Sequence, residues 1–251
     1  PNGDFPHNPE PLPENLKEIS SLVIKENADF GIVVDPDVDR LAFVCEDGTM
    51  FGEEYTLVAI SDYVLSKNPG NTVSNLSSTR ALRDITVQHN GKYEVSAVGE
   101  VNVVEKMKEI NAIIGGEGNG GVIYPDLHYG RDALIGIALF LTQIAEKDIS
   151  VKNLRKSYPN YFISKNKINQ TKDINVNLIL STLERKFKNE DITTIDGLKI
   201  DFNDGWVHLR KSNTEPIIRI YAESNSQEAA SKLAEDMICL LYTSDAADDS
   251  L

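Results

Sequence analysis

Three aspartates in alternate positions, followed by an arginine, are the first residues of the chain whose types and spacing suggest chemistry. The run is Asp35-Pro36-Asp37-Val38-Asp39-Arg40. Alternate side chains of an extended segment point the same way, so Asp35, Asp37 and Asp39 would present three carboxylates together. Converging carboxylates repel one another unless a cation lies between them. Oxygen ligands suit a hard divalent ion, and the run therefore predicts a Mg²⁺ site.

Three other interpretations of this aspartate loop stay open. An EF-hand calcium loop has the same acidic spacing, with Glu46 at its twelfth position, but Arg40 stands where such a loop needs glycine. A Mg²⁺-dependent haloacid-dehalogenase-like phosphatase would use an aspartate after a buried strand as nucleophile. There, Arg40 replaces the small or β-branched residue expected after the motif. The third interpretation is a solvated acidic turn without metal.

A glycine-rich stretch at residues 115–121 reads Gly-Gly-Glu-Gly-Asn-Gly-Gly. Glycine lets a backbone approach a ligand closely. Glu117 and Asn119 offer acceptors and a donor for sugar hydroxyls, so the stretch suggests a sugar-binding loop, with a flexible surface turn as the alternative. His128 and Arg131 follow closely, and we expect His128 to be a loop residue and not a catalytic one.

A third polar stretch, Arg210-Lys211-Ser212-Asn213-Thr214-Glu215-Pro216, joins two predicted strands, and Arg219 follows it. A guanidinium, hydroxyl groups, an amide and the N–H groups of a turn together suit a phosphate. The alternative is a polar hairpin turn, because Ser, Asn and Thr are ordinary turn residues. The presence of a metal loop and a sugar-type loop in the same chain favours phosphate.

Apolar periodicity predicts the elements that must position these loops. Before Pro159 we expect strands at residues 30–34, 41–45, 71–76, 93–98 and 112–115, and helices at 14–27, 53–67, 79–90, 102–110 and 132–147. The strand at 30–34 is expected to be buried because it is short, apolar and rich in β-branched residues. The alternation of strands and helices predicts an α/β layer with a largely parallel or mixed sheet.

The pattern changes after Pro159 to that of a separate α+β unit. We expect strands at residues 161–169, 196–200, 205–210 and 216–223, and helices at 175–188 and 227–238. From Cys239 the sequence leaves the helical pattern for small and acidic residues, and we interpret residues 239–251 as a tail that is not native to the gene.

Composition excludes several classes of function. The chain has 251 residues and a net charge of −14, which argues against nucleic acid or an anionic membrane as a partner. No apolar run approaches the length of a membrane helix, and the sequence opens without a signal peptide. Its first residue is Pro1, so we expect the natural N-terminus to lie upstream. Two cysteines, Cys45 and Cys239, fit a reducing cytoplasm.

The three loops, in this order, resemble the α-D-phosphohexomutase family, whose members interconvert 6-phospho and 1-phospho sugars. The aspartate loop resembles the family's metal loop, residues 115–121 its sugar loop and residues 210–216 its phosphate loop; residues 5–12 also resemble the segment ahead of its metal loop. The resemblance implies mixed-sheet, three-layer α/β domains followed by a smaller α+β domain. We expect the end of the family's second domain at 1–50, the third domain at 51–160, the fourth at 161–238, and the tail at 239–251.

The resemblance also implies roles for individual residues. Asp35, Asp37 and Asp39 would bind Mg²⁺, Arg40 would help hold the reactive phosphoryl group, and sugar hydroxyls would contact Glu117 and Asn119. The expected ligands of the non-reacting phosphate are Arg210, Ser212, Asn213 and Thr214, supported by Arg219. The expected substrate is a hexose phosphate, glucosamine phosphate before mannose or glucose phosphate, with a hexose 1,6-bisphosphate as intermediate. A sugar-phosphate or Ca²⁺ binding module without chemistry is the remaining alternative.

The sequence departs from the family pattern in three places. The family's phosphorylated serine stands in a Ser-His-Asn-Pro loop, whereas here Pro6 precedes His7-Asn8-Pro9, so we expect this chain to be a fragment that is inactive alone. Many members end the sugar loop with Ser-Gly-His, and here it ends Asn119-Gly120-Gly121, a form that some members share. No basic residue stands at residues 96–99, where several members carry one.

Overall fold

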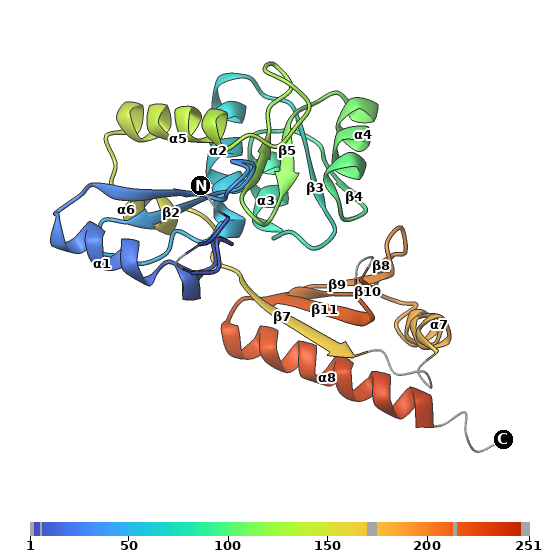
Figure 1. Cartoon of the computed structure of the whole chain (residues 1–251). Helices are drawn as coiled ribbons and strands as arrows, with labels where there is room; N and C mark the ends of the chain where they lie inside the picture. Colours follow the sequence, from blue (N-terminus) through green and yellow to red (C-terminus); the bar gives the residue numbers. More distant parts are fainter. Residues whose placement is uncertain (1–2, 6, 170–174, 213–214, 247–251) are drawn as a thin grey trace. The chain divides into compact units, whose positions relative to one another are not determined.

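The computed structural model describes residues 3–5, 7–169, 175–212 and 215–246 (Figure 1). The chain divides into two compact units, Pro1–Pro159 and Asn160–Leu251. Pro6, in the segment ahead of the metal loop, and Asn213 and Thr214, expected in the phosphate loop, lie outside the described residues. Within the described part of the chain, no helix has both the length and the apolar character needed to cross a membrane.

A four-stranded mixed sheet forms the centre of the first unit. Its order is β4-β3-β5-β6, with β4, β3 and β5 parallel and β6 antiparallel to β5. These strands are β3 (Asn71–Asn75), β4 (Tyr93–Ser96), β5 (Ala112–Glu117) and β6 (Gly121–Ile123). The predicted mixed sheet is therefore confirmed.

Helices cover both faces of this sheet. They are α2 (Glu53–Lys67) and α3 (Ala81–Gln88), which pack on each other, and α4 (Glu100–Ile110). Successive residues of β5 show the two faces: a side chain at Gly115 would meet Met107 of α4, and one at Gly116 would meet Leu57 of α2. The unit thus has the three layers that we expected.

A second, two-stranded sheet carries the aspartates. Here β1 (Phe30–Val34) pairs antiparallel with β2 (Leu41–Cys45), α1 (Lys17–Lys25) packs on one face and α5 (Ala133–Lys147) on the other. Phe43 of β2 stacks on Phe140 of α5, with ring centroids 3.7 Å apart.

The expectation that β1 is buried is wrong, because its Ile32 and Val34 are each 37% exposed. All five residues of β2 are buried, whereas α5 leaves these two side chains of β1 uncovered among the described residues. An apolar run in the sequence thus indicates a strand but does not show which neighbour covers it.

Two short helices of the first unit were not predicted. A 3₁₀ turn, η1 (Pro13–Asn15), precedes α1, so the first α-helix begins at Lys17 and not at residue 14. After α5, helix α6 (Val151–Lys156) begins where the Ser150 hydroxyl accepts a hydrogen bond from the Asn153 amide. Both are too short for apolar periodicity to reveal.

The second unit is a five-stranded antiparallel sheet of order β7-β11-β10-β9-β8 with two helices. Figure 1 shows α8 running along this sheet. The elements are β7 (Phe162–Asn169), α7 (Val176–Lys186), β8 (Asp191–Thr193), β9 (Leu198–Phe202), β10 (Gly205–Lys211), β11 (Ile217–Ser224) and α8 (Gln227–Ala246). The expected α+β organisation is confirmed; the edge strand β8 was missed.

The expected end of the last helix at Ile238 is wrong, because α8 continues to Ala246. Ala234, Met237 and Leu241 are all buried in the core of the unit. Their spacing follows one helical face, so the apolar stripe persists past Ile238 to Leu241, and the small and acidic residues begin only after Tyr242. Residues 239–241 therefore belong to the fold, whereas the non-native origin of the tail stays a prediction.

His208 of β10 is a buried titratable group, with 1% of its surface exposed. Its Nε2 lies 2.7 Å from the carbonyl oxygen of Asp196. Burial, aided by the positive charges of Lys199 and Arg210, lowers the pKa of His208 from 6.5 to about 4. The unfolded chain therefore binds a proton between these two pH values that the folded chain does not, so stability falls as the pH falls through this window.

We expect the free energy of unfolding of the second unit to drop by about 3 kcal/mol from this one group between pH 6.5 and 4. Urea denaturation of the full chain, followed by the fluorescence of Trp206, measures it, because Trp206 is the sole tryptophan and is buried in β10. The His208→Gln variant keeps a donor for Asp196 but cannot titrate, and should show a flatter dependence on pH. If the free energy of unfolding depended on pH equally in the two proteins, His208 would not be the group responsible.

Candidate functional site

The aspartate loop is a tight turn between β1 and β2 and not the extended segment that we predicted. Val38 has φ +61°, a left-handed conformation that is rare for a β-branched residue and that reverses the chain here. The Asp35 Oδ1 atom accepts hydrogen bonds from the amides of Asp39 (3.1 Å) and Arg40 (3.0 Å). The turn still brings one oxygen each of Asp35, Asp37 and Asp39 within 4.8 Å of one another.

The electrostatics of this turn fit a cation. Burial opposes ionisation of Asp35, but the amide hydrogen bonds outweigh it and hold the pKa of that carboxyl below its usual range. Burial, together with the neighbouring Asp35, raises the pKa of Asp39 to about 6. Asp39 Oδ1 is also buried without a hydrogen-bond partner among the described residues. The atoms of Asp35, Asp37 and Asp39 that could bind a metal are all carboxylate oxygens, the ligands that a hard divalent ion prefers.

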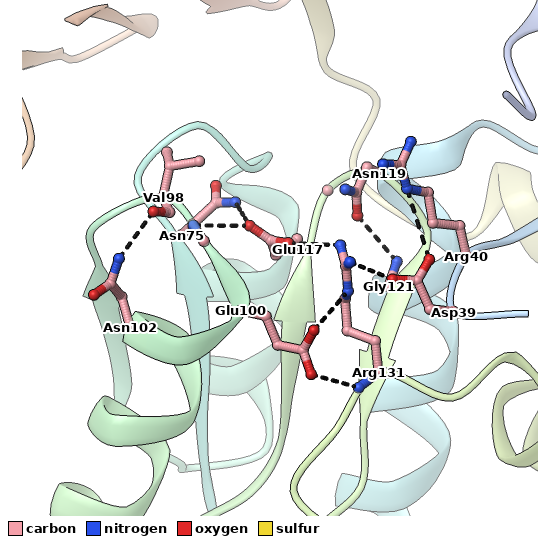
Figure 2. Close-up of polar contacts among 12 residues, drawn as sticks. Asp39, Arg40, Asn75, Val98, Glu100, Asn102, Glu117, Asn119, Gly121 and Arg131 are labelled. Atoms are coloured by element: carbon pink, nitrogen blue, oxygen red, sulfur yellow. Dashed lines mark hydrogen bonds and ion pairs between the residues drawn. The ribbon is translucent and has the colours of Figure 1, made fainter. Parts of the chain in front are cut away.

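Arg40, expected to hold the reactive phosphoryl group, contacts three carboxylates in this structure, and Figure 2 shows its contact with Asp39. Its Nη1 lies 3.0 Å from Oε1 of Glu10, which belongs to the segment ahead of the metal turn. Its Nε lies 3.5 Å from Asp35 Oδ2 and 3.8 Å from Asp39 Oδ1. The guanidinium therefore neutralises part of the acidic turn.

The glycine-rich stretch is a hairpin between β5 and β6, with residues 118–120 as its turn. Because its glycines have no side chains, other residues pack closely against them. A Cβ on Gly118 would lie 1.8 Å from Glu54 Oε2, and one on Gly120 (φ +89°) would lie 2.3 Å from Leu41 O. The Leu41 amide donates to Gly120 O (3.1 Å), so the hairpin is joined directly to the start of β2. Close approach to a ligand was the expected reason for these glycines; close approach to the chain itself is the observed one.

Glu117 is 5% exposed and accepts three hydrogen bonds. The donors to Oε1 are Asn75 Nδ2 (2.8 Å) and the Gly99 amide (3.1 Å), and the donor to Oε2 is Arg131 Nη1 (2.9 Å). Asn119 is half-buried and its Oδ1 accepts from the Gly121 amide at 3.2 Å. Contact of Glu117 and Asn119 with a sugar stays a prediction.

Arg131 is the residue of this site that the sequence did not reveal. Its guanidinium lies among three carboxylates, pairing through Nη2 with Asp39, through Nη1 with Glu117, and through Nε with Glu100 Oε2 at 3.3 Å (Figure 2). The available signal was indirect: converging carboxylates require countercharge, and Arg131 follows the glycine-rich stretch closely. His128, expected to be a loop residue, lies outside the described helices and strands and pairs with Asp132 at 3.0 Å.

In the second unit, Arg210 of β10 and Arg219 of β11 lie directly opposite each other in the strand register, and Lys167 of β7 lies opposite Arg219. The Arg219 Nη2 pairs with Glu215 Oε2 at 2.9 Å, and the Ser212 amide donates to Ile217 O at 2.9 Å. The register thus places three cationic residues side by side on adjacent strands, and Lys167 was not predicted among them. Asn213 and Thr214 stay untested because they lie outside the described residues.

A cavity of about 730 Å³ opens elsewhere in the first unit. Asn27, Phe30, Leu141 and Asp148 are among its lining residues, and no predicted site residue is. Phe30 stands at the end of β1 opposite to Asp35, so this cavity is separate from the aspartate turn.

Models of one protein family match three consecutive parts of the chain. The phosphoglucomutase/phosphomannomutase α/β/α domain II matches residues 1–48, α/β/α domain III matches 52–161 and the C-terminal domain matches 164–239. The chain belongs to the phosphoglucomutase/phosphomannomutase family. The resemblance drawn from the three loops is thereby confirmed, while the exact domain boundaries that we expected stay a prediction.

Individual family members give the same result. The chain is 37% identical over 243 residues to a phosphoglucomutase/phosphomannomutase of Thermococcus kodakarensis, covering 96% of this chain and 53% of the relative. It is 31% identical to a phosphoglucosamine/phosphogalactosamine mutase of Sulfurisphaera tokodaii, covering 91% and 51%. A crystal structure of a family protein from Burkholderia thailandensis superposes with a TM-score of 0.79 at 28% identity, covering 95% and 52%. The chain spans about half the length of the curated relatives that it matches.

Gly120→Ala tests the join between the hairpin and β2. We expect it to destabilise the first unit by more than about 2 kcal/mol, because its Cβ would lie 2.3 Å from Leu41 O. Gly99→Ala is the matched control: φ is also positive (+118°), but the nearest atom is Asn102 Nδ2 at 3.5 Å. Thermal denaturation followed by circular dichroism measures both variants. Equal melting temperatures would show that the close approach is unimportant.

Proposed function

We propose that this chain is the metal- and substrate-binding part of a phosphohexomutase that interconverts hexose 6-phosphate and hexose 1-phosphate. One observation carries the proposal: the turn with three aspartates is joined by a backbone hydrogen bond, Leu41 N to Gly120 O at 3.1 Å, to the hairpin that carries Glu117 and Asn119. A metal site and a set of groups suited to sugar hydroxyls are therefore neighbours in one unit.

In this proposal Asp35, Asp37 and Asp39 would hold Mg²⁺, whose positive charge would stabilise negative charge on phosphoryl oxygens. Arg40 leaves Glu10 and takes the reactive phosphoryl group, since a guanidinium binds phosphate by two parallel hydrogen bonds. Glu117 and Asn119 orient the sugar through its hydroxyls. A phosphoserine, which this sequence does not contain in the Ser-His-Asn-Pro context, would donate the phosphoryl group and recover one from a hexose 1,6-bisphosphate. We therefore expect no turnover from this chain alone.

The second unit would bind the phosphate that is not reacting. Arg210 suits this role because its guanidinium is poorly satisfied among the described residues. Its Nη1 makes only a long hydrogen bond, 3.4 Å, to the carbonyl oxygen of Lys211, and its Nε is buried without a hydrogen-bond partner. Ser212 and Arg219 flank it, and Asn213 and Thr214 complete the predicted set. Of the possible substrates, the Asn119-Gly120-Gly121 turn leads us to favour glucosamine phosphate over mannose and glucose phosphates. We place the protein in the cytoplasm, where its buried Cys45 would stay reduced.

Mg²⁺ titration of the full chain by calorimetry tests the metal site. We expect Asp35→Asn to weaken Mg²⁺ binding at least about tenfold, because it removes a charged ligand from a hard-ion site. Asp148→Asn is the control: it removes the same charge from the first unit, at a left-handed position (φ +48°) that asparagine also adopts. Preference for Ca²⁺ over Mg²⁺, without any binding of hexose phosphates, would replace the mutase assignment with a binding module.

The same variant separates a mutase from a phosphatase. A phosphatase with Asp35 as nucleophile would hydrolyse p-nitrophenyl phosphate in this chain, and Asp35→Asn would abolish that hydrolysis. The mutase proposal expects no hydrolysis above the uncatalysed rate in either protein. Supplying the upstream half of a relative and assaying glucosamine, mannose and glucose phosphates would then identify the substrate.

Arg210→Ala tests the phosphate site. We expect it to weaken the binding of glucosamine 6-phosphate about tenfold or more, and to leave the weak binding of glucosamine unchanged, because a guanidinium–phosphate pair contributes about 1.5–3 kcal/mol. Arg185→Ala serves as the control, since Arg185 is exposed on α7 and its recorded partner is Thr182 of the same helix. Equal losses for both sugars would show that Arg210 stabilises the fold and does not bind phosphate.

A further inference from the structure

Two of the three clustered carboxylates each have one oxygen held by a donor. In Asp35 it is Oδ1, held by two backbone amides. In Asp39 it is Oδ2, held by the Arg131 guanidinium. The other oxygens, Asp35 Oδ2 and Asp39 Oδ1, lie 3.5 and 3.8 Å from the same atom, Arg40 Nε. These two oxygens therefore face one position, beside Arg40 in this structure, and Arg131 does for Asp39 what the turn amides do for Asp35.

Arg131 is itself held firmly. Its amide donates to Glu100 Oε1 at 3.2 Å, and its Nε lies 3.3 Å from Oε2 of the same carboxylate. Its backbone bridges to Ile123 of β6, and its side chain is 15% exposed. An arginine anchored by its backbone amide, with its guanidinium beside the Glu100 carboxylate, can orient a carboxylate that lies 92 residues away in the sequence.

A second nitrogen of the Arg131 guanidinium contacts the hairpin between β5 and β6. Arg131 Nη1 donates to Glu117 Oε2 at 2.9 Å. Glu117 is oriented in turn by Asn75 and by the Gly99 amide. One rigid cation thus spans a predicted metal ligand and a predicted sugar ligand.

We propose that Arg131 is a positioning residue: it turns Asp39 Oδ1 toward the metal position and couples that ligand to Glu117, so that the metal turn and the sugar hairpin form together. The proposal rests on the proposed function. The alternative hypothesis is that Arg131 is only a countercharge, which Mg²⁺ must displace in order to bind. Groups around a metal ligand that fix its orientation commonly change metal affinity 10- to 100-fold when removed, whereas removal of a competing cation tightens binding.

Calorimetry of the full chain with Mg²⁺ alone distinguishes the two hypotheses. We expect Arg131→Met to weaken Mg²⁺ binding about tenfold. Arg131→Lys keeps the charge but lacks the planar fork, and should recover only part of that loss. Arg83→Met is the control, because it removes the same charge from the same unit, where Arg83 pairs with Asp84 at 3.3 Å. It should bind Mg²⁺ as the unmodified chain does.

Glu117→Gln supplies a second test, which holds even if Arg131→Met fails to fold. Glu117 belongs to the hairpin and not to the aspartate turn, and Arg131 links its carboxylate to Asp39. Comparison with the double variant separates this route from the loss of a negative charge and from the Leu41–Gly120 hydrogen bond. We expect a loss of about threefold in Mg²⁺ affinity, and less than additive losses when both changes are combined. Unchanged or tighter Mg²⁺ binding in Arg131→Met, or in Glu117→Gln where the former does not fold, overturns the proposal. Absence of Mg²⁺ binding in the unmodified chain instead overturns the metal site of the proposed function, and this inference with it.

Discussion

Mutual repulsion of carboxylates at one edge of the first unit is the constraint on which the site depends. The acidic side chains gathered there are Asp35, Asp37, Asp39, Glu100 and Glu117. Two guanidiniums, Arg40 and Arg131, face them. Burial and the neighbouring aspartates raise the pKa of Asp39 to about 6, although Arg131 opposes the rise. A group of acids left partly uncompensated is a natural place for a divalent cation.

The sequence indicated part of the composition of this acidic cluster but not its geometry. The aspartate run predicted which carboxylates meet, because they are neighbours in the chain. It did not predict the turn, because nothing in the residue types announces a left-handed Val38. The role of Arg131 was not predicted for a different reason. Its partner Asp39 lies 92 residues away in the sequence, and no periodicity relates distant segments that the fold brings together.

The fold shows the same division between local and distant information. Most helices and strands follow from apolar spacing, and the family resemblance followed from short motifs. Strand order and register do not, so the alignment of Lys167 with Arg219 and Arg210 emerged only from the antiparallel pairing of β7, β11 and β10. The exposure of Ile32 on β1 likewise depends on what packs above it and not on the strand's own residues.

The hairpin turn at residues 118–120 has a consequence for how specificity can diverge. A side chain at Gly120 would meet the backbone of Leu41 and could not be accepted without a shift of the chain, whereas one at Gly118 would meet the movable end of the Glu54 side chain. Within this turn, substitution is therefore most constrained at Gly120. A lineage that changes its preferred sugar through this hairpin would alter Glu117 or Asn119 and keep Gly120, and larger changes must arise in the elements around the hairpin.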